Sequence, residues 1–109
     1  MNTIRILTPP GSGAIAVVEI DGANAWDTVK QLFKPANPKP LPDQPILHRT
    51  WFGTLGEGVG DEVILAVKRV EPSPIIEIHC HGGQRVVRWV ILLLHSTSSI
   101  RRLHRKSHS

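Results

Sequence analysis

The sequence predicts a single α+β domain in which a mixed β-sheet packs with two helices, in the order β-β-α-β-β-β-α. Two observations lead to this fold class. Runs rich in β-branched residues are separated by Gly and Pro turns, and two segments carry apolar residues at helical spacing. The chain has 109 residues, of which 40% are hydrophobic. That length and composition suit one domain with a modest core.

The first half of the chain is expected to form two strands, a helix and an extended connection. Strands are predicted over Thr3–Leu7 and Ala14–Ile20, with a Pro-Pro-Gly-Ser-Gly turn between them. Apolar residues then recur at helical spacing over about Ala23–Phe33. Five of the nine prolines follow within Pro35–Pro45, which predicts an extended connection because proline removes a backbone donor and restricts its predecessor.

The second half is expected to form three strands and a buried helix. The strands are predicted over His48–Gly53, Glu62–Val70 and Ile75–Cys80, with the Gly-rich stretch Glu57–Gly60 as a turn between the first two. The helix is predicted over about Gln84–His95, where apolar residues recur at i, i+3, i+4 and i+7.

The basic charge of the chain is concentrated at its end. The formal net charge is +4, but four of the 13 basic residues follow residue 95, where no acid occurs, so that nine bases face nine acids before it. We therefore expect a domain over residues 1–95 and a basic, disordered tail over residues 96–109. The neutral body disfavours a basic nucleic-acid-binding protein.

The sequence predicts a cytoplasmic protein. Its one cysteine, Cys80, cannot form an internal disulfide, and no signal-peptide pattern opens the chain. The longest apolar run, Trp89–Leu94, is far too short to span a membrane, so no membrane partner is expected.

The stretch IIEIHCHGG concentrates the polar groups of greatest chemical interest. Side chains alternate along a strand, so Glu77, His79 and His81 should share one face, and Cys80 should lie with isoleucines on the other. Cys80 is accordingly predicted to pack in the core. No further ligand motif completes a zinc site, so no metal is expected.

Two interpretations of the histidines stay open. His79 and His81 either form a pair hydrogen-bonded to backbone at the strand end or line a ligand site. Glu77 is flanked by isoleucines, and a carboxylate there is costly unless it has a partner, which makes Glu77 a candidate binding group.

Two other patterns favour structural roles. Gly11–Ala16 (GSGAIA) matches part of a dinucleotide-binding fingerprint, but a strand rather than a helix follows, and the chain has no P-loop. The stretch is therefore interpreted as a tight turn, and no nucleotide is expected in this chain. The tryptophans are interpreted as packing residues rather than as a stacking surface for bases.

Four collinear stretches together resemble a known domain. They are TPPGSGAIAVVEIDG (Thr8–Gly22), LFKP (Leu32–Pro35), the GTL…DEVILAVK stretch (Gly53–Lys68) and IIEIHCHGG (Ile75–Gly83). The chain resembles the N-terminal domain of tRNA-modification GTPases of the TrmE/MnmE type over residues 3 to about 94.

The resemblance implies a fold similar to folate-binding aminomethyltransferase domains, pairing as a homodimer and binding a tetrahydrofolate such as 5-formyltetrahydrofolate. In the family, a helical domain and a G domain follow, and the assembly modifies the wobble uridine of tRNA with a flavin-dependent partner protein. The acid of the EIHCHGG motif carries over as Glu77, with His79 and His81 as candidates to line the site.

The resemblance is incomplete at three places. Glu19 stands where the family usually carries an arginine of the folate site. The segment Arg69–Pro74 is shorter than the family's YTGED-like loop, and a later segment with a folate-contacting lysine is replaced by HSTSSIRRLHRKSHS. We therefore expect a truncated or frame-shifted copy, or a divergent remnant.

These observations lead to one main hypothesis and two alternatives. The chain is expected to be a folate-binding and dimerisation module with no GTPase activity of its own. The alternatives are a stand-alone one-carbon transfer enzyme and a divergent non-functional remnant.

Overall fold

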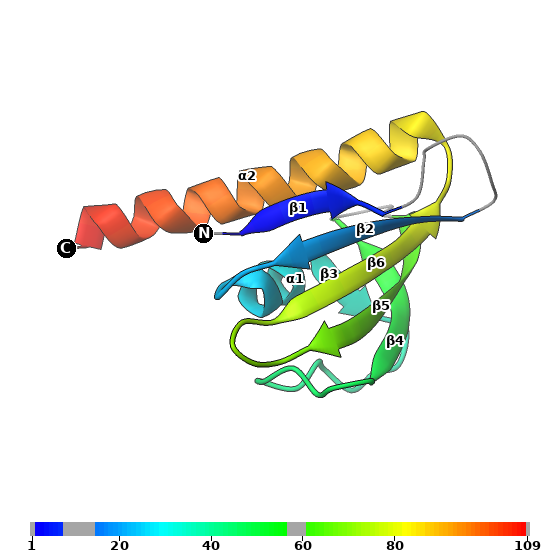
Figure 1. The fold of residues 1–109 in the computed structure, drawn as a ribbon, viewed down its shortest axis with the longest axis horizontal. Helices are drawn as coiled ribbons and strands as arrows, with labels where there is room; N and C mark the ends of the chain where they lie inside the picture. The colour runs from blue at the N-terminus through cyan, green and yellow to red at the C-terminus, as the bar shows by residue number, and fades with distance from the viewer. Residues whose placement is uncertain (1, 8–14, 57–60, 109) are drawn as a thin grey trace.

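The computed structural model describes residues 2–7, 15–56 and 61–108, and the side chains as far as residue 97. It contains a six-stranded sheet with the strand order β1-β2-β6-β5-β4-β3 and two helices (Figure 1). The elements in chain order are β1 (Thr3–Ile6), β2 (Ile15–Asp21), α1 (Ala25–Leu32), β3 (Phe33–Pro35), β4 (Thr50–Leu55), β5 (Asp61–Arg69), β6 (Ile75–His81) and α2 (Gln84–His108).

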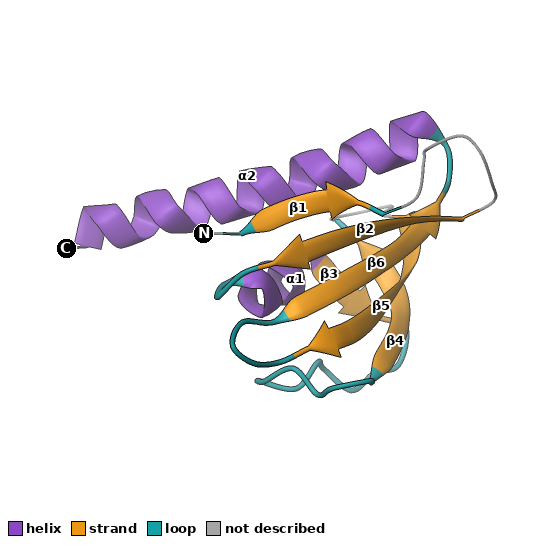
Figure 2. Cartoon of the chain, in the orientation of Figure 1, coloured by secondary structure: helices purple, strands orange, loops and turns teal. Residues whose placement is uncertain are grey.

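The α+β class is confirmed, with two differences in the sheet. Every neighbouring pair of strands is antiparallel, so the sheet is not mixed as predicted. The short strand β3 was not predicted, because the helical pattern extends to Phe33 (Figure 2). Phe33 instead enters the core from a strand. Gly53, which pairs with Pro35, allows the close approach of β3 to β4, since a Cβ at Gly53 would overlap the carbonyl oxygen of Lys34.

The last helix is longer than predicted. The apolar pattern predicts an end near His95, whereas α2 continues to His108. Residues 96–108 contain neither glycine nor proline, and arginine, leucine and lysine among them favour helix. The domain boundary at residue 95 stays a prediction.

Two predicted turns, over Pro9–Gly13 and Glu57–Gly60, lie outside the described residues, as does most of the Gly11–Ala16 fingerprint. The strands on either side of the first turn do pair, from Thr3 with Asp21 to Ile6 with Val18.

The core lies between one face of the sheet and the two helices. Alternate residues of the central strands are fully or almost fully buried there, together with apolar residues of both helices. The main buried side chains from the sheet are Val18, Ile20, Leu65, Val67, Ile76 and Ile78, and those from the helices are Trp26, Val29, Val87, Val90 and Leu94. The opposite face of the sheet, which we call the open face, carries the polar side chains of the same strands.

The structural interpretations of Cys80 and the tryptophans are confirmed. Cys80 is buried on the core face, and burial, with a smaller effect of the Asp61 charge, raises the pKa of its thiol. Trp26 is buried, and Trp51 and Trp89 pack against the core.

Across the described part of the chain, we find no helix long and apolar enough to cross a membrane.

Candidate functional site

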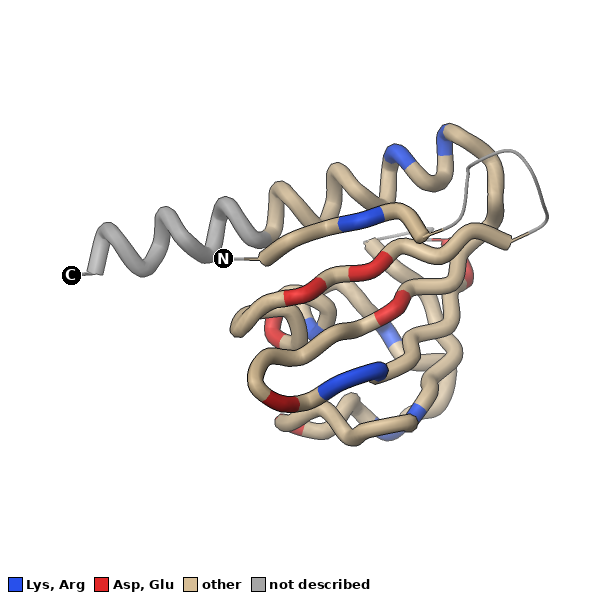
Figure 3. The backbone as a smooth tube through the Cα atoms, in the orientation of Figure 1, with Lys and Arg blue, Asp and Glu red and all other residues tan. Residues whose placement is uncertain are grey.

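The open face brings two carboxylates together across neighbouring strands. Glu19 on β2 is the direct partner of Glu77 on β6, and Arg5 on β1 is the direct partner of Glu19. The acidic positions of β2 and β6 lie side by side in Figure 3. Like charges directly opposite each other in a sheet are destabilising, so this arrangement requires compensation.

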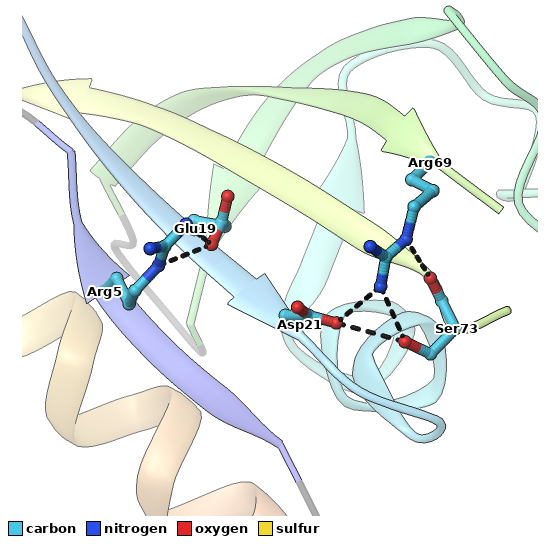
Figure 4. Close-up of polar contacts among 5 residues, drawn as sticks. All are labelled: Arg5, Glu19, Asp21, Arg69 and Ser73. Carbon is cyan, nitrogen blue, oxygen red and sulfur yellow. Dashed lines mark hydrogen bonds and ion pairs between the residues drawn. The ribbon is translucent and has the colours of Figure 1, made fainter. Parts of the chain in front are cut away.

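Arg5 compensates the charge of Glu19. The Glu19 Oε2 atom accepts a hydrogen bond from Nε of Arg5 at 2.8 Å and forms an ion pair with Nη2 of Arg5 at 2.7 Å (Figure 4). The side chain of Glu19 is only 9% exposed, whereas that of Arg5 is 62% exposed. A carboxylate that is largely removed from water is therefore paired with a cation whose remaining donors face solvent.

His79 is the partner of Glu77. The Nε2 atom of His79 lies 3.1 Å from Oε1 of Glu77, and both side chains are partly buried. This contact accounts for one oxygen of Glu77. The predicted arrangement of β6 is confirmed, with Glu77, His79 and His81 on the open face and Cys80 on the other.

An apolar pocket lies beside the two histidines. Its volume is about 160 Å³, and it is lined by His79, His81, Glu62 and three exposed apolar residues, besides the buried Val63 and Cys80. Those three, Ile15, Phe52 and Ile64, are the exposed apolar residues of the open face, with exposed fractions of 60%, 52% and 42%. Glu77, Glu19 and Arg5 lie farther along the same face. The open face therefore offers an apolar wall next to a carboxylate.

Neither the role of Arg5 nor the apolar wall was predicted from the sequence. Paired residues of β1 and β2 are equally far from position 12 in the sequence, so counting outward from the predicted Gly-Ser-Gly turn would have placed Arg5 opposite Glu19. Alternation along Glu62–Val70 would likewise have put Ile64 on the solvent side. Phe52 could be assigned only once the pairing of β4 with β5 was known.

A second polar cluster joins the end of β2 to the connection between β5 and β6. Nη2 of Arg69 donates to Oδ1 of Asp21 at 3.2 Å and to Oγ of Ser73 at 2.9 Å, and the Ser73 hydroxyl donates to the same Asp21 oxygen at 3.1 Å (Figure 4). Because these groups bond to one another, we assign the cluster a structural role: it holds the Arg69–Pro74 segment against β2.

Among the described residues, no group of three or more His, Cys, Asp or Glu side chains could hold a metal ion.

Known proteins resemble this chain over almost its whole length. The profile of the family described as "GTP-binding protein TrmE N-terminus" matches residues 3–105. Three proteins called tRNA modification GTPase MnmE are similar: one from Christiangramia forsetii is 35% identical over 97 residues, one from Chlorobium phaeobacteroides 41% over 97, and one from Exiguobacterium sibiricum 35% over 104. These alignments cover 84%, 82% and 88% of the chain.

The similarity concerns one part of those relatives. The chain spans 20%, 20% and 22% of their respective lengths.

Proposed function

Because this chain belongs to the family of TrmE N-terminal domains, we propose that it is the folate-binding and dimerisation module of a tRNA-modification GTPase. In this proposal a reduced folate such as 5-formyltetrahydrofolate binds to the open face, and Glu77 is the residue that recognises it. The observation that carries the proposal is a largely buried carboxylate, that of Glu77, which contacts His79 at the border of an apolar pocket, on a sheet face that neither α1 nor α2 covers.

The chemistry of the pterin ring matches these groups. The ring presents an N–H beside an amino group, and one carboxylate can accept both hydrogen bonds. The flat ring would lie on the apolar wall formed by Ile15, Phe52 and Ile64, with His79 and His81 at its border. The ion pair with Arg5 would reduce the repulsion between Glu19 and a negatively charged ligand, because the guanidinium compensates the charge of the carboxylate.

The size of the pocket supports the proposed homodimer. Sites that enclose small molecules measure roughly 300–1,000 Å³, whereas the pocket on the open face has about 160 Å³. One chain would therefore cover only part of a folate, and a second copy would supply another wall.

The wider setting is proposed from the relatives. The proteins named above are tRNA modification GTPases, and we propose that this chain serves the same process, in the cytoplasm, with tRNA and a flavin-dependent protein as partners. Within it, residues 1–95 would form the module and residues 96–109 a basic extension.

Replacing Glu77 tests the proposal. Hydrogen bonds to a charged group contribute about 1.5–3 kcal/mol, so Glu77→Gln should weaken binding of 5-formyltetrahydrofolate by roughly ten- to a hundredfold. Isothermal titration calorimetry measures the dissociation constants. Glu71→Gln is the matched control, because Glu71 is exposed outside the strands, and it should bind like the wild type. Equal affinities of wild type and Glu77→Gln would contradict the assignment.

A further inference from the structure

The proline-rich segment between β3 and β4 encloses a second cavity, away from the open face. Its volume is about 270 Å³, and it is lined by Asn37, Lys39, Pro40, Pro42, Ile46, Arg49 and Trp51. We call it the proline-segment pocket. The side chain of Trp51 points to the core side of β4, whereas that of Phe52 points to the open face. The proline-segment pocket is therefore separate from the apolar pocket on the open face.

The pocket is held in shape by contacts within the protein. The indole Nε1 of Trp26 donates to the carbonyl oxygen of Pro42 at 3.1 Å, which fixes one wall to α1. The ring centroids of Trp26 and Trp51 lie 5.5 Å apart, and this contact fixes the wall of the pocket that Trp51 forms. The prolines restrict the backbone further. A ligand would therefore find the cavity already formed, with little ordering cost.

The backbone beside the pocket is strained. His48 has a φ of 67°, in the left-handed region that side chains other than glycine rarely adopt. The strands hold it there: His48 N–H donates to the oxygen of Val67, and Val67 N–H donates to the oxygen of Arg49. Such strain is concentrated at ligand clamps and active sites, and here it positions Arg49 at the rim of the pocket.

The lining is cationic on one side and apolar on the other. Lys39 and Arg49 are both exposed, and among the described residues neither side chain forms an ion pair. The Arg49 guanidinium lies 5.3 Å from the centre of the Trp51 ring, which is a cation–π contact that leaves its N–H donors available. Among the residues that the structure describes, no carboxylate lines the cavity. The positive charges of Lys39 and Arg49 therefore favour an anionic group, and the apolar side of the pocket favours a flat, weakly polar ring.

We propose that the proline-segment pocket binds one nucleotide, with the base against the apolar side formed by Pro40, Pro42 and Ile46 and the phosphate between Lys39 and Arg49. The volume is close to the lower limit for small-molecule sites, which suits a single nucleotide unit. Recognition of single-stranded RNA commonly combines an aromatic or arginine surface for a base with cations for its phosphate. The same chemistry accepts a free nucleotide or one residue of a single strand.

The test uses the whole chain and two probes: a fluorescein-labelled single-stranded oligouridylate, followed by anisotropy, and uridine 5′-monophosphate, followed by calorimetry. The variant Lys39→Gln/Arg49→Gln should weaken binding of whichever probe binds by about tenfold. The slope of the logarithm of the binding constant against the logarithm of salt concentration should decrease by about one for each lost phosphate contact. Lys68→Gln removes an exposed cation from β5 and is the matched control. The cations after residue 100 are unchanged in every variant and contribute the same background.

The two probes identify the source of the ligand. Binding of the oligonucleotide alone assigns the pocket to an RNA strand, and binding of uridine 5′-monophosphate with the same dependence on Arg49 assigns it to a free nucleotide. Equal affinities of wild type, the double variant and the control overturn the proposal. So does inorganic phosphate that competes as well as the nucleotide, because the base would then contribute nothing. None of these outcomes depends on folate binding.

Discussion

The variant Arg5→Glu should lose about 2–3 kcal/mol of its free energy of unfolding. The residue Glu19 is 7% exposed, and its carboxylate accepts a hydrogen bond from Arg5 and forms an ion pair with the same guanidinium. Reversing the charge would leave that carboxylate unpaired and would place three acids side by side on β1, β2 and β6. The value is below that of a fully buried pair because the side chain of Arg5 is 62% exposed, so water can partly replace it. Urea denaturation measures the loss.

Two further variants separate the pair from a general charge effect. Lys68→Glu makes the same change of charge at an exposed position of β5 and should cost less than about 0.5 kcal/mol. The swapped variant Arg5→Glu/Glu19→Arg restores the pair and brings an arginine opposite Glu77, so it should recover most of the stability. If Arg5→Glu is as stable as Lys68→Glu, the ion pair between Arg5 and Glu19 does not stabilise the domain.

Replacing Ile78 by alanine should destabilise the domain by about 2–5 kcal/mol. Ile78 is completely buried at the middle of β6, where it pairs with Val18 on one side and Leu65 on the other. Its removal would leave a cavity between the sheet and the helices that neighbouring strands can close only in part. Thermal and urea unfolding followed by circular dichroism measure the effect.

Ile64→Ala is the matched control for Ile78→Ala. It removes the same atoms from the neighbouring strand, but Ile64 lies on the open face and is 42% exposed. We expect a loss of about 1 kcal/mol or less together with weaker folate binding, because Ile64 lines the apolar pocket. Similar losses of stability in both variants would mean that the two faces of the sheet have been assigned incorrectly.

The sequence predicts the faces of β6 because strand alternation is a local property. The isoleucines and Cys80 alternate with Glu77, His79 and His81, and no knowledge of neighbouring strands is needed to separate them. The helix α1 was predicted for a similar reason, since its apolar stripe repeats over two turns.

Features that depend on pairing between distant segments were not predicted. The strand β3 can pair with β4 because Gly53 has no side chain that would overlap the backbone of Lys34. Gly53 lies 19 residues beyond Lys34 in the chain, so this contact is not visible in the local sequence. The Arg5 contact depends on the register of a hairpin, and the Arg69 cluster joins residues 48 positions apart. The far end of α2 was missed because its apolar pattern stops at Leu94, while the backbone helix continues.

The most direct test of the account is to map where 5-formyltetrahydrofolate binds, by following the amide NMR signals of the ¹⁵N-labelled chain during a titration. We expect the largest shifts at Glu77, His79 and His81, with smaller ones at the facing positions Val17 on β2 and Ile64 on β5. The proline-rich segment, residues 37–49, should not respond. Shifts centred on that segment, or no shifts at millimolar ligand, would contradict a folate site on the open face.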